Sequence, residues 1–221
     1  MTACVYCGTR EATTIDDIPP LCLFRRPLPT TIVKVPSCFP RNNGASKDDE
    51  HLRNMLSFRH DVDHPDAEAA REAALRSLVR PEAPGLRAAF LRSVREVELR
   101  TPAGLYLGRA GVYDVDVARV DRVVERIVMG LLYGETRKPL PPGYTTKAYL
   151  LTQIDASADD KLALIVGTVL QKASLRFIGP RTVGYRIFRP PDNADASACL
   201  VTFYERVTWL AITTEDRTPS T

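Results

Sequence analysis

The sequence contains no apolar run that approaches the roughly 18 residues needed to cross a bilayer, so we expect no membrane span. Its first residues lack the apolar core of a secretory signal peptide. It has five cysteines, an odd number that does not suit a disulfide framework in a secreted domain. Together these absences predict a cytoplasmic protein.

An excess of charge of either sign is also missing. The chain has 30 lysines and arginines against 27 acidic residues, a net charge of +3, and no basic tail. Charge therefore permits a nucleic-acid partner without requiring one. The chain also lacks a Walker loop, a G-x-G-x-x-G motif and a G-x-S-x-G motif, which removes the common signals of nucleotide binding and of a serine nucleophile.

What the sequence does contain, near its start, is a pair of cysteines, Cys4 and Cys7, in the run Cys-Val-Tyr-Cys-Gly. Two thiolates at this spacing can bind one tetrahedral ion, and the glycine allows a tight turn. A second pair is expected downstream, but the chain offers Cys38 followed by Arg41 at the position of the fourth ligand. Arginine has no lone pair to donate to a cation. The spacing therefore predicts a zinc knuckle with three ligands in place.

Residues 1–60 are rich in proline and show little helical periodicity before Ser46. The β-branched run over residues 31–35 predicts a short strand. Ser46 and the acidic residues 48–50 predict the start of a helix, with Ser46 as its cap. The predicted order is a knuckle, a short pair of strands and a helix.

The remaining residues, 61–221, alternate between helical and strand-like patterns. Apolar residues at helical spacing predict a helix over 116–134, whose polar residues, Arg126 among them, face water. Further helices are predicted over 65–100 and 158–170, and strands over 103–117, 144–154, 175–189 and 198–213. We therefore predict an α+β fold, with an N-terminal module of residues 1–60 followed by a mixed helical and antiparallel-strand domain of residues 61–221.

Four short motifs in the first quarter of the chain carry a family resemblance. They are Cys4-Val5-Tyr6-Cys7-Gly8, Asp16-Asp17-Ile18-Pro19-Pro20, Val35-Pro36-Ser37-Cys38, and Asn42-Asn43-Gly44 followed by Ser46-Lys47-Asp48-Asp49-Glu50. In order and spacing they resemble the HNH endonuclease family, in the version built around a zinc knuckle. The resemblance implies an N-terminal ββα-metal module, a divalent cation (Mg²⁺ or Mn²⁺), a structural zinc ion, and nucleic acid as partner, DNA more than RNA. The reaction it implies is metal-dependent phosphodiester hydrolysis.

The resemblance also assigns metal ligands to this sequence. Asp16 matches the aspartate that binds the catalytic cation, and Asn42 matches the later His or Asn ligand. Cys4, Cys7 and Cys38 match three of the four zinc ligands.

Two catalytic positions depart from the family pattern. Asp17 stands where the general-base histidine is expected, and Thr31, with Thr30 as the less favoured match, stands where an asparagine would orient that base. The pKa of an aspartate is about 3.9 against about 6.5 for a histidine, so Asp17 would be the weaker base. General-base assistance contributes about 10²–10⁴-fold to a rate, and a carboxylate would recover part of it. We therefore expect impaired hydrolysis, with a catalytically inactive scaffold or regulatory binding protein as the alternative.

Other interpretations of these residues stay open from the sequence. The cysteines of the knuckle could be free thiols, and Cys22 or His51 could supply a fourth zinc ligand. The paired aspartates before two prolines are also typical of a solvated turn. The run from His60 to His64, His-Asp-Val-Asp-His, could bind a metal ion, although capping of the following helix is the favoured interpretation.

Overall fold

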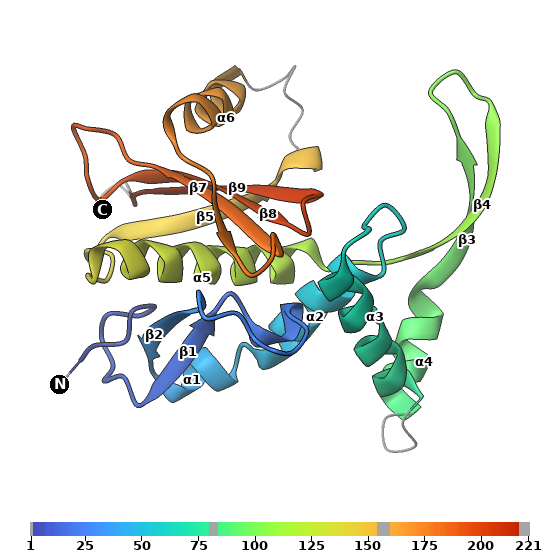
Figure 1. Ribbon diagram of the computed structural model, residues 1–221, viewed down its shortest axis with the longest axis horizontal. Coiled ribbons are helices and arrows are strands. Elements are labelled where there is room, and N and C mark those ends of the chain that lie inside the picture. The colour runs from blue at the N-terminus through green and yellow to red at the C-terminus, as the bar shows by residue number, and fades with distance from the viewer. Residues whose placement is uncertain (1, 80–83, 154–159, 217–221) are drawn as a thin grey trace, which may run out of the picture.

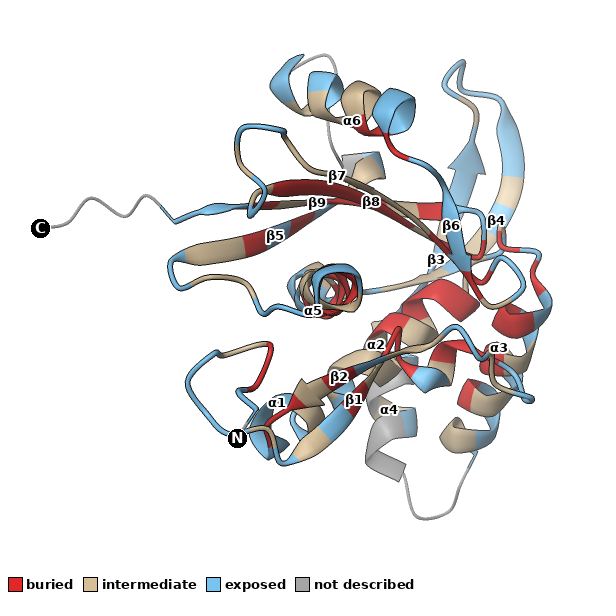
Figure 2. Ribbon diagram, turned by 60° about the vertical axis from the view of Figure 1, so that its left-hand side comes forward, coloured by how far each residue is buried: buried red, intermediate tan, exposed pale blue. Residues whose placement is uncertain are grey.

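The computed structural model describes residues 2–79, 84–153 and 160–216 and arranges them around one long helix, α5 (Val117–Thr136). A five-stranded sheet lies on one side of α5, and the N-terminal hairpin and helices lie on the other (Figure 1). Figure 2 shows the same layers nearly along the axis of α5. The fold is therefore mixed α and β with antiparallel sheets, as predicted.

The N-terminal elements are a hairpin and two helices. Their bounds are β1 Thr14–Ile18, β2 Val33–Ser37, α1 Phe39–Asn43 and α2 Ser46–Ser57, with a short 3₁₀ helix, η1, at Leu21–Leu23. β1 and β2 pair antiparallel, with Asp16 opposite Val35 and Asp17 opposite Lys34. The strand predicted over residues 31–35 is thus present but begins and ends two residues later.

The predicted N-terminal cap is wrong for α2 and confirmed for the next helix, α3. α2 does begin at Ser46, but the prediction that Ser46 caps it is wrong. Ala45 holds the cap position, and Ser46 Oγ instead donates a hydrogen bond to the carbonyl of Asn43 (3.0 Å). At α3 the favoured interpretation is confirmed, because His64 Nδ1 accepts from the backbone N–H of Asp66 (3.1 Å).

Residues 65–79 and 84–113 form two helices and a long hairpin. Their bounds are α3 Pro65–Leu78, α4 Pro84–Ser93, β3 Val94–Arg100 and β4 Tyr106–Tyr113. The prediction of helix as far as residue 100 is wrong, because residues 94–100 pair antiparallel with β4. Val97 and Leu99 alternate with charged residues, a period-two pattern that suits a paired strand. This hairpin projects from the rest of the molecule (Figure 1) and exposes the apolar side chains of residues 105–107.

The C-terminal sheet has the strand order β5-β9-β8-β7-β6, with every neighbouring pair antiparallel. The bounds of these elements and of the associated helices are β5 Tyr144–Leu150, η2 Leu151–Gln153, α6 Asp160–Lys172, β6 Arg176–Ile178, β7 Val183–Phe188, β8 Ser197–Phe203 and β9 Val207–Glu215. α6 covers the face of the sheet opposite α5 (Figure 2). The ends of two predicted elements, Ile154 and residues 158–159, lie outside the described residues.

α5 confirms the helix predicted over residues 116–134 and is the centre of the core. Val124 and Ile127 on its apolar face are completely buried. One cluster of buried residues extends from Val5 to Ala211, so elements on both sides of α5 share a core with it. None of the helices described here is both long and apolar enough to cross a membrane.

The close approach of α5 to β1 requires a glycine at position 130. A Cβ atom there would lie 2.6 Å from Cγ1 of the buried Ile18. We expect Gly130→Ala to lower the free energy of unfolding by about 1–3 kcal/mol, because the core must shift to accept the added methyl group. Urea denaturation would measure this change.

The matched control is Gly167→Ala in α6, where an added Cβ meets no atom within 4 Å. Alanine there should stabilise the protein by up to about 1 kcal/mol through helix propensity alone. If both substitutions stabilised the protein equally, the tight contact between α5 and β1 would be disproved.

Candidate functional site

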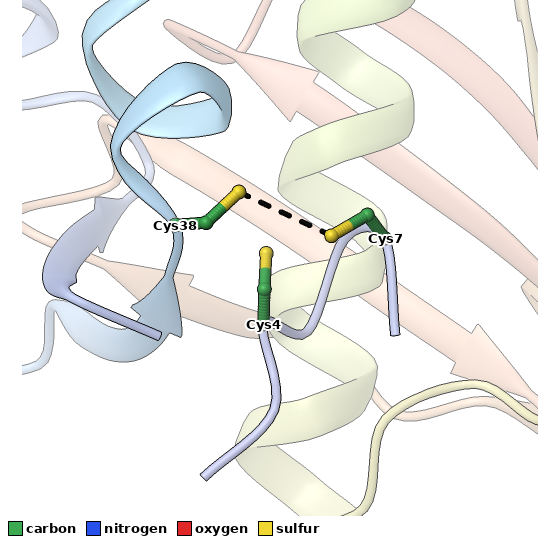
Figure 3. Close-up of side chains that lie close together, drawn as sticks. All are labelled: Cys4, Cys7 and Cys38. Carbon is green, nitrogen blue, oxygen red and sulfur yellow. Dashed lines mark hydrogen bonds between the residues drawn. The ribbon is translucent and has the colours of Figure 1, made fainter. Parts of the chain in front are cut away.

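Three cysteine sulfur atoms lie together beside the N-terminal hairpin (Figure 3). Cys4 and Cys7 come from the loop that precedes β1, and Cys38 directly follows β2. The three Sγ atoms lie within 4.8 Å of one another, and those of Cys7 and Cys38 are 4.0 Å apart. A hydrogen bond from the backbone N–H of Val5 to the carbonyl of Pro36 (3.0 Å) holds the loop against β2. The backbone therefore brings the three predicted zinc ligands to one point.

The turn after Cys7 favours its thiolate. Gly8 has a φ of 64°, which glycine adopts without a side-chain clash. Burial alone would raise the pKa of Cys7, but hydrogen bonds, first among them those from the backbone N–H groups of Thr9 and Arg10, lower that pKa to about 6. Burial raises the pKa of Cys38. Because a thiolate is the form that binds a metal ion, Cys7 is the better prepared of these two ligands.

The geometry of the three thiols suits zinc. Sulfur atoms bound at about 2.3 Å to one tetrahedral ion lie about 3.8 Å apart, so the three would move only slightly toward one another. Arg41, at the fourth position, lies with Arg10 in the wall of a hollow of about 420 Å³ beside Cys7. Three thiolates would thus hold the ion and leave one coordination position for an outside ligand such as water.

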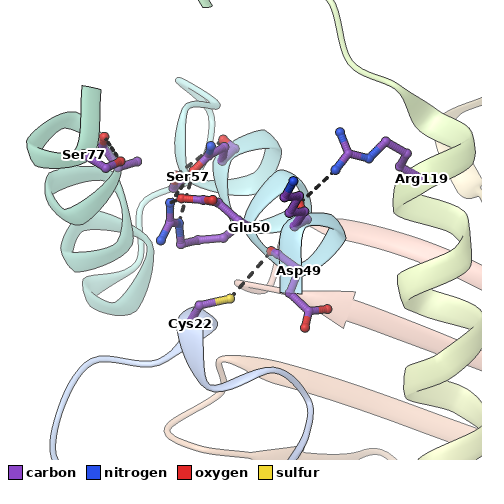
Figure 4. A network of polar contacts seen from close by, with 10 residues as sticks. Cys22, Asp49, Glu50, Ser57, Ser77 and Arg119 are labelled. Atoms are coloured by element: carbon purple, nitrogen blue, oxygen red, sulfur yellow. Dashed lines mark hydrogen bonds and ion pairs between the residues drawn. The ribbon is translucent and has the colours of Figure 1, made fainter. Parts of the chain in front are cut away.

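Neither of the other donors considered for the fourth position lies in this cluster. Cys22 Sγ donates to the backbone carbonyl of Asp49 (3.6 Å; Figure 4). His51 Nε2 accepts from the backbone N–H of Asp116 (3.1 Å). Over residues 2–79, 84–153 and 160–216, the three cysteines are the one group of Cys, His, Asp and Glu side chains close enough to hold a metal ion. The run of residues 60–64 does not form such a group.

A second feature, an acidic hollow of about 490 Å³, lies between β1 and α2. Its wall includes Asp16 and Asp17 of β1, Asn42 of α1, and Asp49, Glu50 and Arg53 of α2. Arg53 is paired with Glu50 (2.9 Å). The structure therefore brings together Asp16 and Asn42, which the resemblance assigns to the divalent cation, and Asp17, at the general-base position. The carboxylates of Asp49 and Glu50 line the same hollow.

Asp16 and Asp49 share one cation, Arg126 of α5. Arg126 Nε lies 3.6 Å from Asp16 Oδ2, and Arg126 Nη2 donates a hydrogen bond to Asp49 Oδ1. Tyr6 donates its hydroxyl to the same oxygen of Asp16 (2.8 Å). Arg126 is only 8% exposed, so the prediction that it faces water is wrong. Its partners come from β1 and α2, which helical periodicity within α5 could not reveal.

Burial and charge act in opposite directions on this cluster. Burial raises the pKa of Asp16 and the pKa of Asp49, while Arg126 acts to lower both. Burial also works against the charged form of Arg126, but the carboxylates outweigh it and the pKa of Arg126 is raised. Burial, reinforced by Asp16, raises the pKa of Tyr6, which keeps its hydroxyl protonated as a donor. The cluster therefore contains a permanently charged guanidinium.

The remaining predicted site residues make other contacts. Asp17 Oδ1 accepts from Lys34 Nζ (3.0 Å) across the hairpin. Thr31 Oγ1 accepts from the backbone N–H of Gly179 (3.3 Å), in the turn between β6 and β7. Asn42 Nδ2 donates to a backbone carbonyl of β1 (3.0 Å) and is thereby fixed to the hairpin. Thr31 thus contacts the C-terminal sheet, and Asp17 is paired with a surface lysine.

Sequence reasoning missed the roles of Tyr6, Asp49 and Arg126. Asp49 resembled an ordinary acidic residue in the first turn of a helix, and Tyr6 stood inside the knuckle motif. A weak signal existed for Arg126, because it lies three residues after Val123 and directly before Ile127, at the edge of the buried stripe of α5.

Comparison of the chain with family models, with curated proteins and with solved structures finds no match.

Proposed function

We propose that this protein binds nucleic acid, DNA more readily than RNA, through an N-terminal module of HNH-endonuclease ancestry in which phosphodiester hydrolysis is impaired. The support is the arrangement of residues 2–57: a three-cysteine cluster, an antiparallel hairpin and a helix, with Asp16 and Asn42 at one hollow. Zinc held by the three thiolates would tie the first loop to the end of β2, which is a structural role.

The observation that carries the binding function is a pair of arginines beside the cysteine cluster. Arg10 and Arg41 are both exposed and line one hollow with Cys7 and Thr9, and no acidic side chain lines that hollow. Neither arginine forms an ion pair with any residue in the described part of the chain. Guanidinium groups bind phosphate oxygens in a bidentate manner, so the two are suited to successive phosphates of a backbone.

The contacts of Asp17 and Thr31 support impaired hydrolysis. A general base must be free to accept a proton, whereas Asp17 is an aspartate already paired with Lys34. Thr31, at the position that would orient the base, is bonded to Gly179 instead.

The test is the salt dependence of duplex DNA binding, measured by fluorescence anisotropy. Replacing Arg10 and Arg41 by alanine removes two phosphate contacts, so the slope of log K against log salt concentration should become shallower by about 1.8. The matched control, Arg87→Ala with Arg92→Ala, removes two exposed arginines of α4, which lies across the molecule from α1 (Figure 1). An equal change in the control would contradict the assignment.

A non-catalytic scaffold is the second candidate function, and the projecting β3–β4 hairpin favours it. Leu105 and Leu107 near its tip are 66% and 62% exposed, which suits contact with another surface better than contact with water. Absence of DNA binding at low salt would favour this candidate over the first.

A further inference from the structure

The guanidinium of Arg126 contacts two carboxylates of the acidic site, the buried Asp16 and the partly buried Asp49. We infer that Arg126 is the cation of these two carboxylates, in place of the divalent metal ion that an HNH nuclease would bind. Asp16 comes from β1, Asp49 from α2 and Arg126 from the middle of α5. Three elements that are distant in sequence therefore meet at one charged cluster.

The burial of the cluster requires such a cation. The side chains of Asp16, Asp49 and Arg126 are 8%, 17% and 9% exposed. Two carboxylates withdrawn from water to this degree are unfavourable unless a positive charge lies beside them. Arg126 is the residue that supplies this charge to both, since one guanidinium contacts Oδ2 of Asp16 and Oδ1 of Asp49.

The two carboxylate oxygens that face Arg126 do not fit a divalent ion as they stand. Magnesium demands oxygen ligands at about 2.0–2.1 Å in octahedral geometry. Asp49 Oδ1 is occupied by Arg126 Nη2, and Asp16 Oδ2 faces both Arg126 Nε and the hydroxyl of Tyr6. A dication between the same oxygens would lie next to a fixed positive charge, and the two would repel each other.

The hydrogen bonding of Arg126 indicates that its positive charge contributes more to the cluster than its N–H donors do. Its Nε and Nη1 atoms are buried and have no hydrogen-bond partner among the described residues. A guanidinium selected for hydrogen-bonded recognition would satisfy most of its five N–H groups. Here the ion pairs with Asp16 and Asp49 hold it.

The test is manganese binding to the full-length protein, followed by electron paramagnetic resonance and without nucleic acid, so that its result is independent of the proposed function. We expect no Mn²⁺ binding to the wild-type protein that depends on Asp16. Arg126→Gln removes the charge while keeping much of the side-chain length. It should gain a Mn²⁺ site at least about tenfold tighter than any binding by the wild type. Adding Asp16→Asn to Arg126→Gln should abolish that site.

Two outcomes would overturn the inference. One is Mn²⁺ binding by the wild-type protein that Asp16→Asn removes. The other is a folded Arg126→Gln protein that gains no Mn²⁺ site. If Arg126→Gln does not fold, the comparison of wild type with Asp16→Asn decides the question: Asp16-dependent binding overturns the inference, and its absence supports it.

Discussion

Replacing Arg126 by alanine is expected to lower the free energy of unfolding by about 3–5 kcal/mol, because it leaves the buried Asp16 and the partly buried Asp49 without their cation. Asp16 and Asp49 would then keep their largely buried side chains without a guanidinium beside them, and the Tyr6 hydroxyl and the backbone N–H of Asp17 would remain as donors to Asp16. The loss exceeds that of an ordinary surface ion pair because solvent cannot replace the missing charge.

Urea denaturation followed by circular dichroism would measure the loss, and Arg122→Ala is its matched control. Arg122 lies one turn earlier on the same helix, is 57% exposed, and forms a 3.5 Å ion pair with Asp48. Its replacement should cost less than about 1 kcal/mol, as exposed ion pairs do. A similar loss for both variants would show that Arg126 acts through general helix stability and not through the buried carboxylates.

A second comparison separates the charge of the cluster from its packing. Removing all three charges together, by Asp16→Asn, Asp49→Asn and Arg126→Met, leaves no unpaired ion in the core. Replacing a buried ion pair completely by groups of similar volume is often neutral or stabilising. The triple variant should therefore recover most of the stability that Arg126→Ala loses. If it is no more stable than Arg126→Ala, packing by the arginine side chain is the dominant contribution.

Local periodicity accounts for the parts of the fold that could be predicted. Val120, Val124 and Ile127 repeat at helical spacing and face a core on two sides, so α5 was evident from the sequence. β3 was missed although Val97 and Leu99 alternate with charged residues, because this short period-two run begins directly after the helical segment that ends at Ser93. Its partner, β4, is a separate segment, and the pairing decides that the run is a strand.

In the candidate site, too, the local features could be predicted from the sequence and the contacts between distant elements could not. The cysteine cluster followed from the spacing of Cys4, Cys7 and Cys38, because a short loop and a hairpin suffice to bring the three together. The partner of Asp16 is 110 residues away in sequence and lies on a helix outside the N-terminal module. This contact depends on how α5 packs on the β1–β2 hairpin, and no local sequence pattern predicts that packing.

Adding a fourth thiolate should strengthen zinc binding more than any other single change in the knuckle. In Arg41→Cys the new thiol would stand at the position where the resemblance expects a ligand. The backbone N–H of Arg41 donates to the carbonyl of Cys38 (3.0 Å), and Arg41 and Cys7 line the same hollow, so position 41 is already beside the cluster. A complete set of four thiolates closes the tetrahedron and excludes the outside ligand.

We expect the dissociation constant for zinc to fall at least about a hundredfold in Arg41→Cys, equivalent to about 2.7 kcal/mol. With zinc in excess, the added binding energy stabilises the folded state by a similar amount, because only that state holds the ligands together. Competition with a chromophoric chelator would measure the affinity, and urea denaturation with and without zinc would measure the linked stability. Arg41→Ser is the control, since it removes the arginine charge and bulk without adding a thiolate, and its affinity should stay near that of wild type. If Arg41→Ser tightened zinc binding as much as Arg41→Cys, relief of charge repulsion would be the cause, and the three-thiolate cluster would not be one ligand short.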